Sequence, residues 1–187
     1  MERKVINAPT ECNYLGQFMT ELPVNCLFDK GITGCGGTTI ALTNEKDTII
    51  AIPYVSAIKN KIQQAEDDKK KEIYKHNLLG VYADITDENI LDYVDSHETK
   101  KILVTYDSLE RVITALQNIG IDVYKDYYLL IDEWHILFNS YLFRNETIKK
   151  VLHHCTQFKE VTYMTATPIE DEFILEELKH LPVVCVE

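Results

Sequence analysis

The sequence predicts an α/β fold with a mostly parallel sheet and helices on both of its faces. Segments typical of strands alternate with segments of helical spacing along nearly the whole chain, and this alternation indicates parallel strands joined by crossover helices. Several of the expected strands are continuous apolar runs, such as TIIAI at residues 48–52 and YLLI at residues 128–131. Such runs are typical of strands that are buried on both sides.

The expected strands are short, rich in β-branched and aromatic residues, and bounded by turn residues. They are Val24–Phe28, Thr48–Ile52, Gly80–Ala83, Lys101–Thr105, Tyr127–Ile131, Glu160–Met164 and Val183–Val186.

The expected helices carry apolar residues three or four positions apart, so that one face of each helix can be buried. They are Val55–Lys75, Asp87–His97, Ser108–Ile119, Thr147–Phe158 and Ile169–Leu181. The start of the chain is less regular. We therefore expect residues 1–20 to form an N-terminal extension of a single domain that spans residues 21–187.

The bulk composition is that of an ordinary globular protein, with 45% hydrophobic and 26% charged residues. No apolar run approaches the roughly 20 residues that span a bilayer, and the N-terminus lacks a signal-peptide pattern, so we expect a cytoplasmic protein without a membrane partner. The net charge of −11 requires any nucleic-acid contact to be local, since binding to phosphate backbones depends on basic surface. The five cysteines, which form no CxxC pair, are expected to be reduced thiols: Cys12, Cys26, Cys35, Cys155 and Cys185.

A glycine-rich loop follows the first expected strand and precedes a helix. Residues Gly31–Thr38 match the nucleotide-binding pattern GxxxxGK[ST] at each fixed position except Gly37, which stands in place of the lysine. That lysine ordinarily contacts the β- and γ-phosphates, so its loss should weaken ATP binding unless another cation, such as Lys30, substitutes. Thr38 stands where a Mg²⁺ ligand belongs, and a loop without any ligand is the alternative interpretation. We expect Gly37→Lys to strengthen ATP binding.

Two carboxylates end the apolar strand near residue 131. Ligands of parallel sheets bind at the carboxyl ends of strands. There Asp132 is suited to hold Mg²⁺ and Glu133 to activate an attacking water. The alternative is a strand that leaves the core with both acids as helix-capping residues.

Together these residues resemble the superfamily 2 helicases, especially the DExH group. The loop Gly31–Thr38 is similar to motif I, Asp132–His135 to motif II, and Thr165–Thr167, followed by Pro168, to motif III. The resemblance covers roughly residues 20 to 187 and implies a three-layer P-loop NTPase domain of the RecA-like type. It also implies ATP and Mg²⁺ as cofactors and nucleic acid as a partner.

The resemblance assigns roles to further residues. The nucleotide-binding residues would be Gly31, Thr33, Gly34, Cys35, Gly36, Gly37, Thr38 and Thr39, with Lys30 nearby and Gln17 upstream as a possible reader of adenine. The residues that couple nucleotide state to the nucleic acid would be His135, Thr165, Ala166 and Thr167. The residues that touch the nucleic-acid backbone would be Pro53, Tyr54, Ser56, Thr105 and Ser108.

Two departures from the family pattern leave the activity open. Gly37 replaces the motif I lysine, and the chain ends where the first RecA-like domain would end, without the second domain that completes the ATP site. We expect a fragment whose second domain is supplied in cis, or a partner that supplies it in trans. The leading interpretation is the ATP-binding motor domain of a helicase or translocase, inactive when isolated. The alternatives are a pseudo-helicase scaffold that binds nucleic acid or protein, and a nucleotide-binding domain outside the helicases.

Overall fold

The computed structural model describes residues 1–67, 73–137 and 145–187. Its strands form one sheet, and every strand pairing within these residues is parallel. The strands are β1 (Arg3–Ile6), β2 (Cys26–Asp29), β3 (Thr48–Ile52), β4 (Leu78–Val81), β5 (Lys101–Thr105), β6 (Tyr128–Asp132), β7 (Glu160–Thr165) and β8 (Val183–Val186). Across the sheet they follow the order β1-β8-β2-β7-β6-β3-β5-β4.

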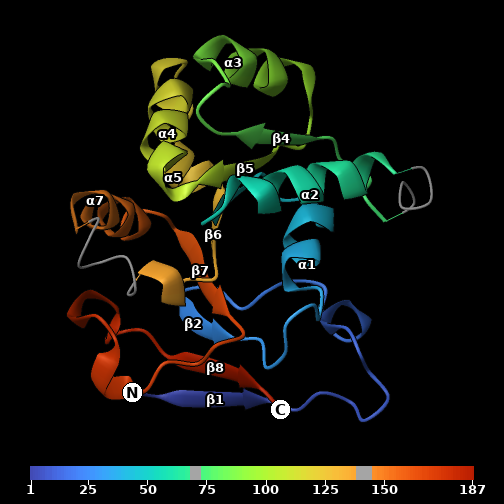
Figure 1. Ribbon diagram of the computed structural model, residues 1–187, viewed down its shortest axis with the longest axis vertical. Coiled ribbons are helices and arrows are strands. Elements are labelled where there is room, and N and C mark those ends of the chain that lie inside the picture. Colours follow the sequence, from blue (N-terminus) through green and yellow to red (C-terminus); the bar gives the residue numbers. More distant parts are fainter. Residues whose placement is uncertain (68–72, 138–144) are drawn as a thin grey trace.

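The helices lie in two layers, one on each face of the sheet (Figure 1). The α-helices are α1 (Gly37–Thr43), α2 (Val55–Glu66), α3 (Asp87–Ser96), α4 (Leu109–Asn118), α5 (Val123–Asp126) and α7 (Asn145–Cys155). The short 3₁₀ helices are η1 (Leu15–Gln17), η3 (Tyr106–Ser108), η4 (Asp171–Phe173) and η5 (Glu176–Leu178).

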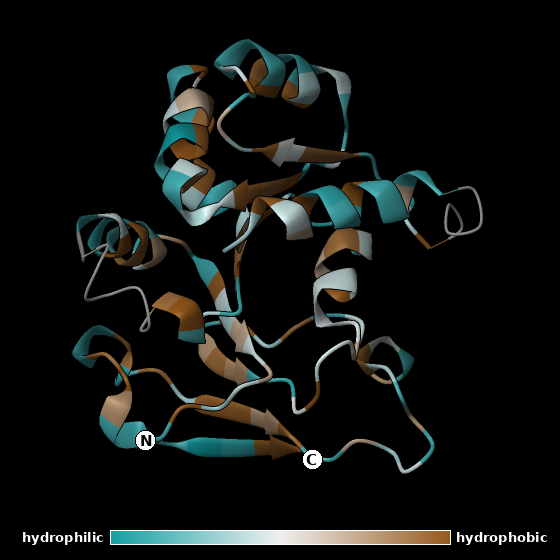
Figure 2. Ribbon diagram, in the orientation of Figure 1, coloured by the Kyte–Doolittle hydropathy of each residue, from teal (hydrophilic) through white to brown (hydrophobic). Residues whose placement is uncertain are grey.

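Each face of the sheet has its own hydrophobic core. On one face, side chains of α3, α4, α5 and α7 pack against strand residues such as Ile49 and Leu129. On the other face, η1, α1 and α2 pack against residues such as Ile50 and Leu130. Successive strand residues therefore enter opposite cores, which explains why β3 and β6 are largely apolar, whereas β7 also carries polar residues (Figure 2). The predicted fold class, with a parallel sheet between two helical layers, is confirmed.

Local sequence explains several element boundaries. Three expected strands, Thr48–Ile52, Lys101–Thr105 and Val183–Val186, are found with the predicted limits. Helix α3 begins after Thr86, whose hydroxyl accepts a hydrogen bond from the backbone N–H of Asn89. That arrangement is a capping box, which satisfies N–H groups that a helix start leaves without partners.

Two helix predictions need correction. The helix expected over Val55–Lys75 ends at Glu66, and its residues 68–72 lie outside the described part of the chain. The helix expected over Ile169–Leu181 is wrong, because only η4 and η5 form there. Its apolar residues do not share one buried face: Ile174 is buried but Phe173 is 62% exposed.

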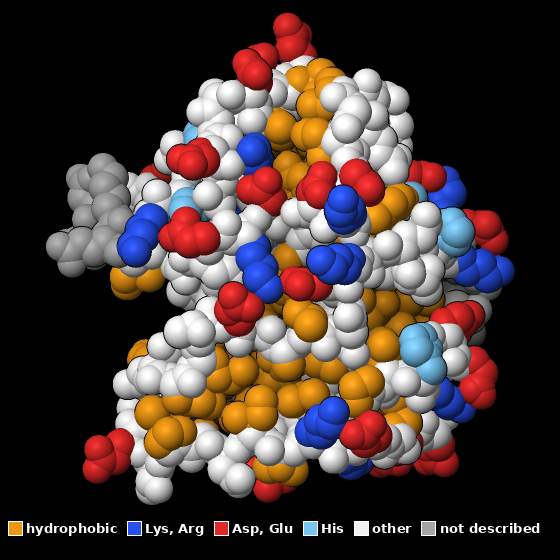
Figure 3. Space-filling view, turned by 180° about the vertical axis from the view of Figure 1, so that it is seen from behind, with side chains coloured by type: hydrophobic (Ala, Val, Ile, Leu, Met, Phe, Trp, Pro, Cys, Tyr) orange, Lys and Arg blue, Asp and Glu red, His pale blue; other side chains and the backbone are white. Residues whose placement is uncertain are grey.

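The N-terminal residues contribute a strand that the sequence did not reveal. Strand β1 lies at the edge of the sheet and pairs with β8, with Arg3 opposite Val183. Its side chains are mostly exposed, so its hydrophobic pattern is weak. From behind, hydrophobic side chains gather over the lower half of the molecule, while many charged side chains lie above them (Figure 3). Among the described residues, no helix is long and apolar enough to cross a membrane.

Candidate nucleotide site

The sheet order brings three predicted segments to one place. Strands β2, β7 and β6 are neighbours, so the segments that follow their carboxyl ends must meet at the same edge. These segments are the glycine-rich loop after β2, the acidic pair at the end of β6 and the Thr-Ala-Thr segment at the end of β7. The register places Asp29 beside Thr165 and Asp132 beside Met164.

The glycine-rich loop depends on left-handed backbone conformations. Gly31, Gly34 and Gly36 have φ angles of 78°, 76° and 88°, which side chains other than glycine adopt only with strain. The loop then enters α1 at Gly37. A curled backbone that leads into a helix N-terminus directs N–H groups toward one point, which favours binding of an anion.

The loop and the acidic strand end are joined by a direct hydrogen bond. The hydroxyl of Thr38, on the first turn of α1, donates to Oδ2 of Asp132 at 3.0 Å. The other carboxylate oxygen, Oδ1, is buried and has no hydrogen-bond donor among the described residues. A hydroxyl and a carboxylate in contact are a fitting donor set for Mg²⁺, which prefers hard oxygen ligands. Both residues predicted to hold the metal therefore lie together.

Lys30 is the cation closest to the acidic pair. Its side chain is only 7% exposed, and its Nζ lies 3.0 Å from Oε1 of Glu133 and 3.6 Å from Oδ1 of Asp132. Burial disfavours the charged ammonium, but the two carboxylates more than offset this, so the pKa of Lys30 is raised above its usual value. Burial together with the charge of Glu133 raises the pKa of Asp132, although Lys30 and the Thr38 hydroxyl act in the opposite direction.

Glu133 is held in an unusual backbone conformation. Its φ angle is 55°, in the left-handed region that costs non-glycine residues free energy. The buried hydroxyl of Tyr106 donates to the main-chain oxygen of Asp132 at 2.7 Å and lies 3.3 Å from that of Glu133. This tyrosine, at the start of η3, thus fixes the turn that carries the two acids.

Met164 occupies the space that a side chain at position 37 would enter. A Cβ built on Gly37 would lie 2.5 Å from Sδ and 3.2 Å from Cε of Met164, and 3.6 Å from Cδ1 of Leu15. Met164 is fully buried on β7, so any side chain at position 37 must displace it. These contacts argue against the expectation that Gly37→Lys simply restores a phosphate contact.

The Thr-Ala-Thr segment is hydrogen-bonded to the segment Asp132–His135. Nδ1 of His135 lies 2.8 Å from Oγ1 of Thr165, and the same hydroxyl accepts a hydrogen bond from the backbone N–H of Thr167 at 2.9 Å. His135 also lies 3.4 Å from a carboxylate oxygen of Glu133. Ala166 between the two threonines is half-buried. Three of the four residues predicted to couple nucleotide state to partners are therefore linked to each other and to Glu133.

A cavity of about 800 Å³ opens over these groups. Of the residues predicted to bind nucleotide or metal, those that line it are Lys30, Gly34, Gly36, Gly37, Thr38, Thr39, Asp132 and Glu133. Gly31, Thr33 and Cys35 do not line it. Thr33 is exposed, whereas Cys35 is buried and its Sγ donates to the main-chain oxygen of Lys30 at 3.6 Å.

Gln17 is close to the loop but does not line the cavity. Its Oε1 accepts hydrogen bonds from the backbone N–H groups of Asn13 and Tyr14, at 2.7 and 2.9 Å. It therefore orders η1, and the ring of Tyr14 lines the cavity instead. The backbone N–H of Leu15 in turn donates to the oxygen of Cys35 at 2.8 Å, which ties η1 to the loop.

The residues predicted to touch nucleic acid lie at the carboxyl ends of two neighbouring strands. Pro53, Tyr54 and Ser56 follow β3, and the hydroxyl of Thr105 at the end of β5 donates to that of Ser108 at 3.1 Å. Tyr54 is 58% exposed. These residues share the edge of the sheet that carries the acids.

Sequence reasoning missed several residues of the site. Lys61 and Gln64 of α2, together with Tyr14 and Tyr74, line the 800 Å³ cavity. No motif marks them, because they lie outside the glycine-rich loop and the strand ends and reach the cavity only through tertiary packing. Lys61 is also close enough for its charge to lower the pKa of Asp132.

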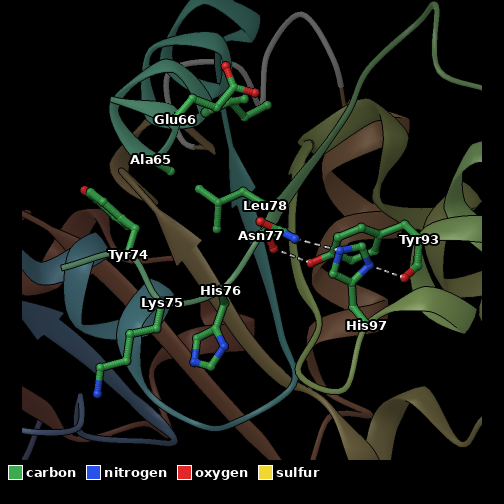
Figure 4. Close-up of a pocket in the computed structure, with 10 residues that line it drawn as sticks. Ala65, Glu66, Tyr74, Lys75, His76, Asn77, Leu78, Tyr93 and His97 are labelled. Carbon is green, nitrogen blue, oxygen red and sulfur yellow. Dashed lines mark hydrogen bonds between the residues drawn. The ribbon is translucent and has the colours of Figure 1, made fainter. Parts of the chain in front are cut away.

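A second cavity, of about 670 Å³, lies beside β4 and contains none of the predicted site residues. Its polar groups largely bond to each other: the Tyr93 hydroxyl donates to the oxygen of Asn77 at 2.6 Å, and Asn77 Nδ2 lies 3.0 Å from His97 Nε2 (Figure 4). In Figure 4, Lys75 and His76 point away from this group. Among the described residues that line this cavity, these hydrogen bonds leave fewer polar groups free to bind a ligand than lie over Asp132.

Comparison with known proteins supports the fold alone. No family model matches the sequence, and no match is found among curated proteins. Among solved structures, the chain is similar to the crystal structure of the DUF1998 helicase MrfA bound to DNA and AMPPNP, with a TM-score of 0.55 and 16% sequence identity. The similarity covers 87% of this chain but only 25% of that protein. The two chains share a fold, and this chain corresponds to about a quarter of the length of that helicase.

Proposed function

We propose that this chain is the ATP-binding domain of a nucleic-acid-dependent ATPase of the helicase type. The observation that carries the proposal is the contact between Thr38 and Asp132, 3.0 Å apart, which joins the glycine loop to the acidic strand end. These segments are 94 residues apart in sequence, and no structural need of an α/β fold requires a hydroxyl and a buried carboxylate to meet there. Burying such a carboxylate is costly unless a cation or hydrogen bonds compensate.

The residues have distinct roles in this proposal. The loop N–H groups bind the phosphates of ATP, and Thr38 and Asp132 hold Mg²⁺, which would neutralise phosphate charge during transfer. Glu133 accepts a proton from the attacking water. His135 and Thr165 link Glu133 to the Thr-Ala-Thr segment, through which nucleotide state would reach a second domain.

The partners follow from the same site. The solved structure of similar fold is a helicase bound to DNA and to an ATP analogue, which supports nucleic acid as the partner of this chain. The surface proposed to meet it carries Pro53, Tyr54, Ser56, Thr105 and Ser108. Because the chain spans a quarter of that helicase, we infer that residues 21–187 act with a second RecA-like domain, in cis or in trans.

A second candidate function is a pseudo-ATPase that binds nucleic acid or protein without hydrolysis. It is favoured by one observation, the absence of a side chain at Gly37. The retained contact of Thr38 with Asp132 and the adjacent Glu133 favour an active enzyme.

The two functions are separated by ATP hydrolysis in the intact protein. We expect Mg²⁺-dependent hydrolysis that single-stranded or duplex nucleic acid stimulates, and we expect Glu133→Gln to abolish it while ATP still binds. Glu110→Gln is the matched control, because Glu110 is an exposed acid on α4 paired with Lys150. Hydrolysis that is absent from the intact protein would exclude the enzyme and favour the scaffold, and hydrolysis that survives Glu133→Gln would exclude Glu133 as the general base.

A further inference from the structure

The position of Lys30 suggests how the site compensates phosphate charge without the loop lysine. Lys30 directly follows β2, and its backbone N–H donates to the oxygen of Thr165 at 2.9 Å. Its side chain therefore extends past the end of β7 and reaches the acids at the end of β6. A lysine is rarely buried unless it is paired, so the acids fix its ammonium at the centre of the site.

A side chain at position 37 would require Met164 to move. The nearest atom to a Cβ at Gly37 is Sδ of Met164 at 2.5 Å, a separation that real Cβ atoms essentially never show. Met164 lies on β7 between β2 and β6, and it belongs to the core under α1. The glycine and the methionine thus fit each other, and the cation has to come from another residue.

We propose that Lys30 supplies the ammonium group that contacts the terminal phosphates of the nucleotide, in place of the loop lysine. This inference rests on the proposed function. A general base must lie beside the water that attacks the terminal phosphate. An ammonium 3.0 Å from Glu133 is therefore within reach of that phosphate, because the flexible four-carbon stem of lysine allows its head group to shift.

The acids keep positive neighbours when Lys30 turns toward a phosphate. Lys61, on α2, lines the same cavity as Asp132 and Glu133, and its charge already acts on Asp132. The bound metal would add further positive charge at Asp132. Lys30 is thereby available to exchange a carboxylate partner for a phosphate partner without leaving the buried acids uncompensated.

The competing explanation is that Lys30 only neutralises the acidic pair. Both explanations predict that removing Lys30 affects the protein, but only ours predicts that the effect depends on the number of phosphates. The test is isothermal titration of the intact protein with ATP, ADP and AMP in the presence of Mg²⁺, comparing wild type with Lys30→Met. Lys59→Met is the matched control, because Lys59 lies on α2 with its ammonium over the ring of Tyr82 and does not line the cavity.

We expect Lys30→Met to weaken ATP binding by about 10- to 100-fold, the range for one charge-assisted hydrogen bond. AMP binding should change less than 3-fold, and Lys59→Met should leave the three affinities unchanged. Equal losses for ATP and AMP, or no loss for either, would overturn the role of Lys30. Failure of the wild-type protein to bind any nucleotide would instead overturn the proposed function, and this inference with it.

A second comparison keeps the test valid if Lys30→Met does not fold. The double variant Lys30→Met/Glu133→Gln removes both members of the closest ion pair, so that no unpaired Glu133 carboxylate remains. It is compared with Glu133→Gln alone, in which Lys30 still pairs with Asp132. We expect the double variant to bind ATP at least 10-fold more weakly than the single variant, and equal affinities would overturn the proposal.

Discussion

The hydroxyl of Tyr106 donates a hydrogen bond to the main-chain oxygen of Asp132 at a distance of 2.7 Å. Tyr106 lies between Thr105 and Ser108, the residues proposed to touch nucleic acid, while Asp132 and Glu133 form the proposed catalytic pair. One buried side chain therefore joins the carboxyl end of β5 to the turn after β6. Because Glu133 has a left-handed backbone, this support fixes a conformation that would otherwise relax.

Tyr106→Phe should slow hydrolysis more than it weakens ATP binding. The ring remains in the core, but the hydrogen bond is lost, which costs about 1 kcal/mol of unfolding free energy. A small shift of Glu133 should lower kcat by roughly 10-fold, since catalysis depends on the positions of the reacting groups. Steady-state kinetics, thermal unfolding and ATP titration measure the three effects.

Tyr93→Phe is the control for Tyr106→Phe. Its hydroxyl also donates to a main-chain oxygen, that of Asn77 at 2.6 Å, and it accepts a hydrogen bond from the backbone N–H of Lys101 at 2.8 Å, but it lies beside β4 and away from the acids. We expect a loss of stability at least as large as that of Tyr106→Phe and an unchanged kcat. A kcat that falls equally in both variants would mean that Tyr106 acts only through general stability.

Gly37→Ala should destabilise the protein because of Met164. Alanine favours the first turn of a helix over glycine by at most about 1 kcal/mol, whereas forcing a methyl group into a packed core costs about 1–3 kcal/mol. The steric cost should therefore dominate. Chemical unfolding of Gly37→Ala, Met164→Ala and the double variant measures the coupling between the two positions.

The double variant should reveal a coupling of about 1 kcal/mol or more, since truncating Met164 removes the atom that collides with the new methyl group. Gly16→Ala is the control, because nothing lies within 4 Å of its Cβ position and it should change stability little. Additive effects of Gly37→Ala and Met164→Ala would show that the loop tolerates a side chain at position 37.

Lys101 should give the folded protein a distinctive dependence on alkaline pH. Its buried ammonium donates to the oxygens of Ala41 and Lys46. Burial lowers the pKa of Lys101 to about 8, against a usual 10.5, although Asp47 and Glu45 oppose this. Between these values the unfolded chain keeps a proton that the folded chain has lost. The free energy of unfolding should therefore rise with pH across this window.

The comparison of wild type with Lys101→Met isolates this contribution. The variant should be less stable at every pH, because buried carbonyl groups lose their donor. The difference between the two proteins should grow by up to about 3 kcal/mol from pH 8 to 10.5, as measured by urea unfolding. A difference that stays constant, or shrinks, would contradict a lowered pKa.

The sequence predicted the candidate site best where its residues lie at or just after the carboxyl ends of strands. Asp132 and Thr38 could be placed together because a parallel sheet brings the carboxyl ends of its strands to one edge, whatever their separation in the chain. The relation between Gly37 and Met164 could not be predicted, because it depends on which strand lies under α1 and which way its side chain points. The pairing of Lys30 with Glu133 depends on the same strand order.

Weak or ambiguous hydrophobic patterns account for the missed strand β1 and for the helix that was wrongly expected over Ile169–Leu181. Strand β1 lies at the sheet edge with exposed side chains on both faces, so its residues Arg3–Ile6 lack a strong apolar signal. The apolar residues near Ile174 have helical spacing, but the backbone after η4 is extended, and only short turns form. Whether such a segment forms a helix or only short turns is decided by tertiary packing, which outweighs the local propensity for helix.

The ring of Tyr14 should bind the base of the nucleotide. Tyr14 is 59% exposed and lines the 800 Å³ cavity, and its ring lies beside the loop at Gly36. Stacking of a base on an aromatic ring contributes about 1–3 kcal/mol and tolerates different bases. We expect Tyr14→Ala to weaken ATP and GTP binding by roughly 10-fold each, whereas Tyr14→Phe should bind both as wild type does.

Inorganic tripolyphosphate separates this effect from that of Lys30, because it has phosphates but no base. Tyr14→Ala should bind it as wild type does, while Lys30→Met should lose affinity for it. Gln17→Ala should resemble a weaker form of Tyr14→Ala, because Gln17 orders the turn through its bond to the backbone N–H of Tyr14 at 2.9 Å. Unchanged ATP affinity in Tyr14→Ala would place the base against other residues that line the cavity, such as Gln64 and Tyr74.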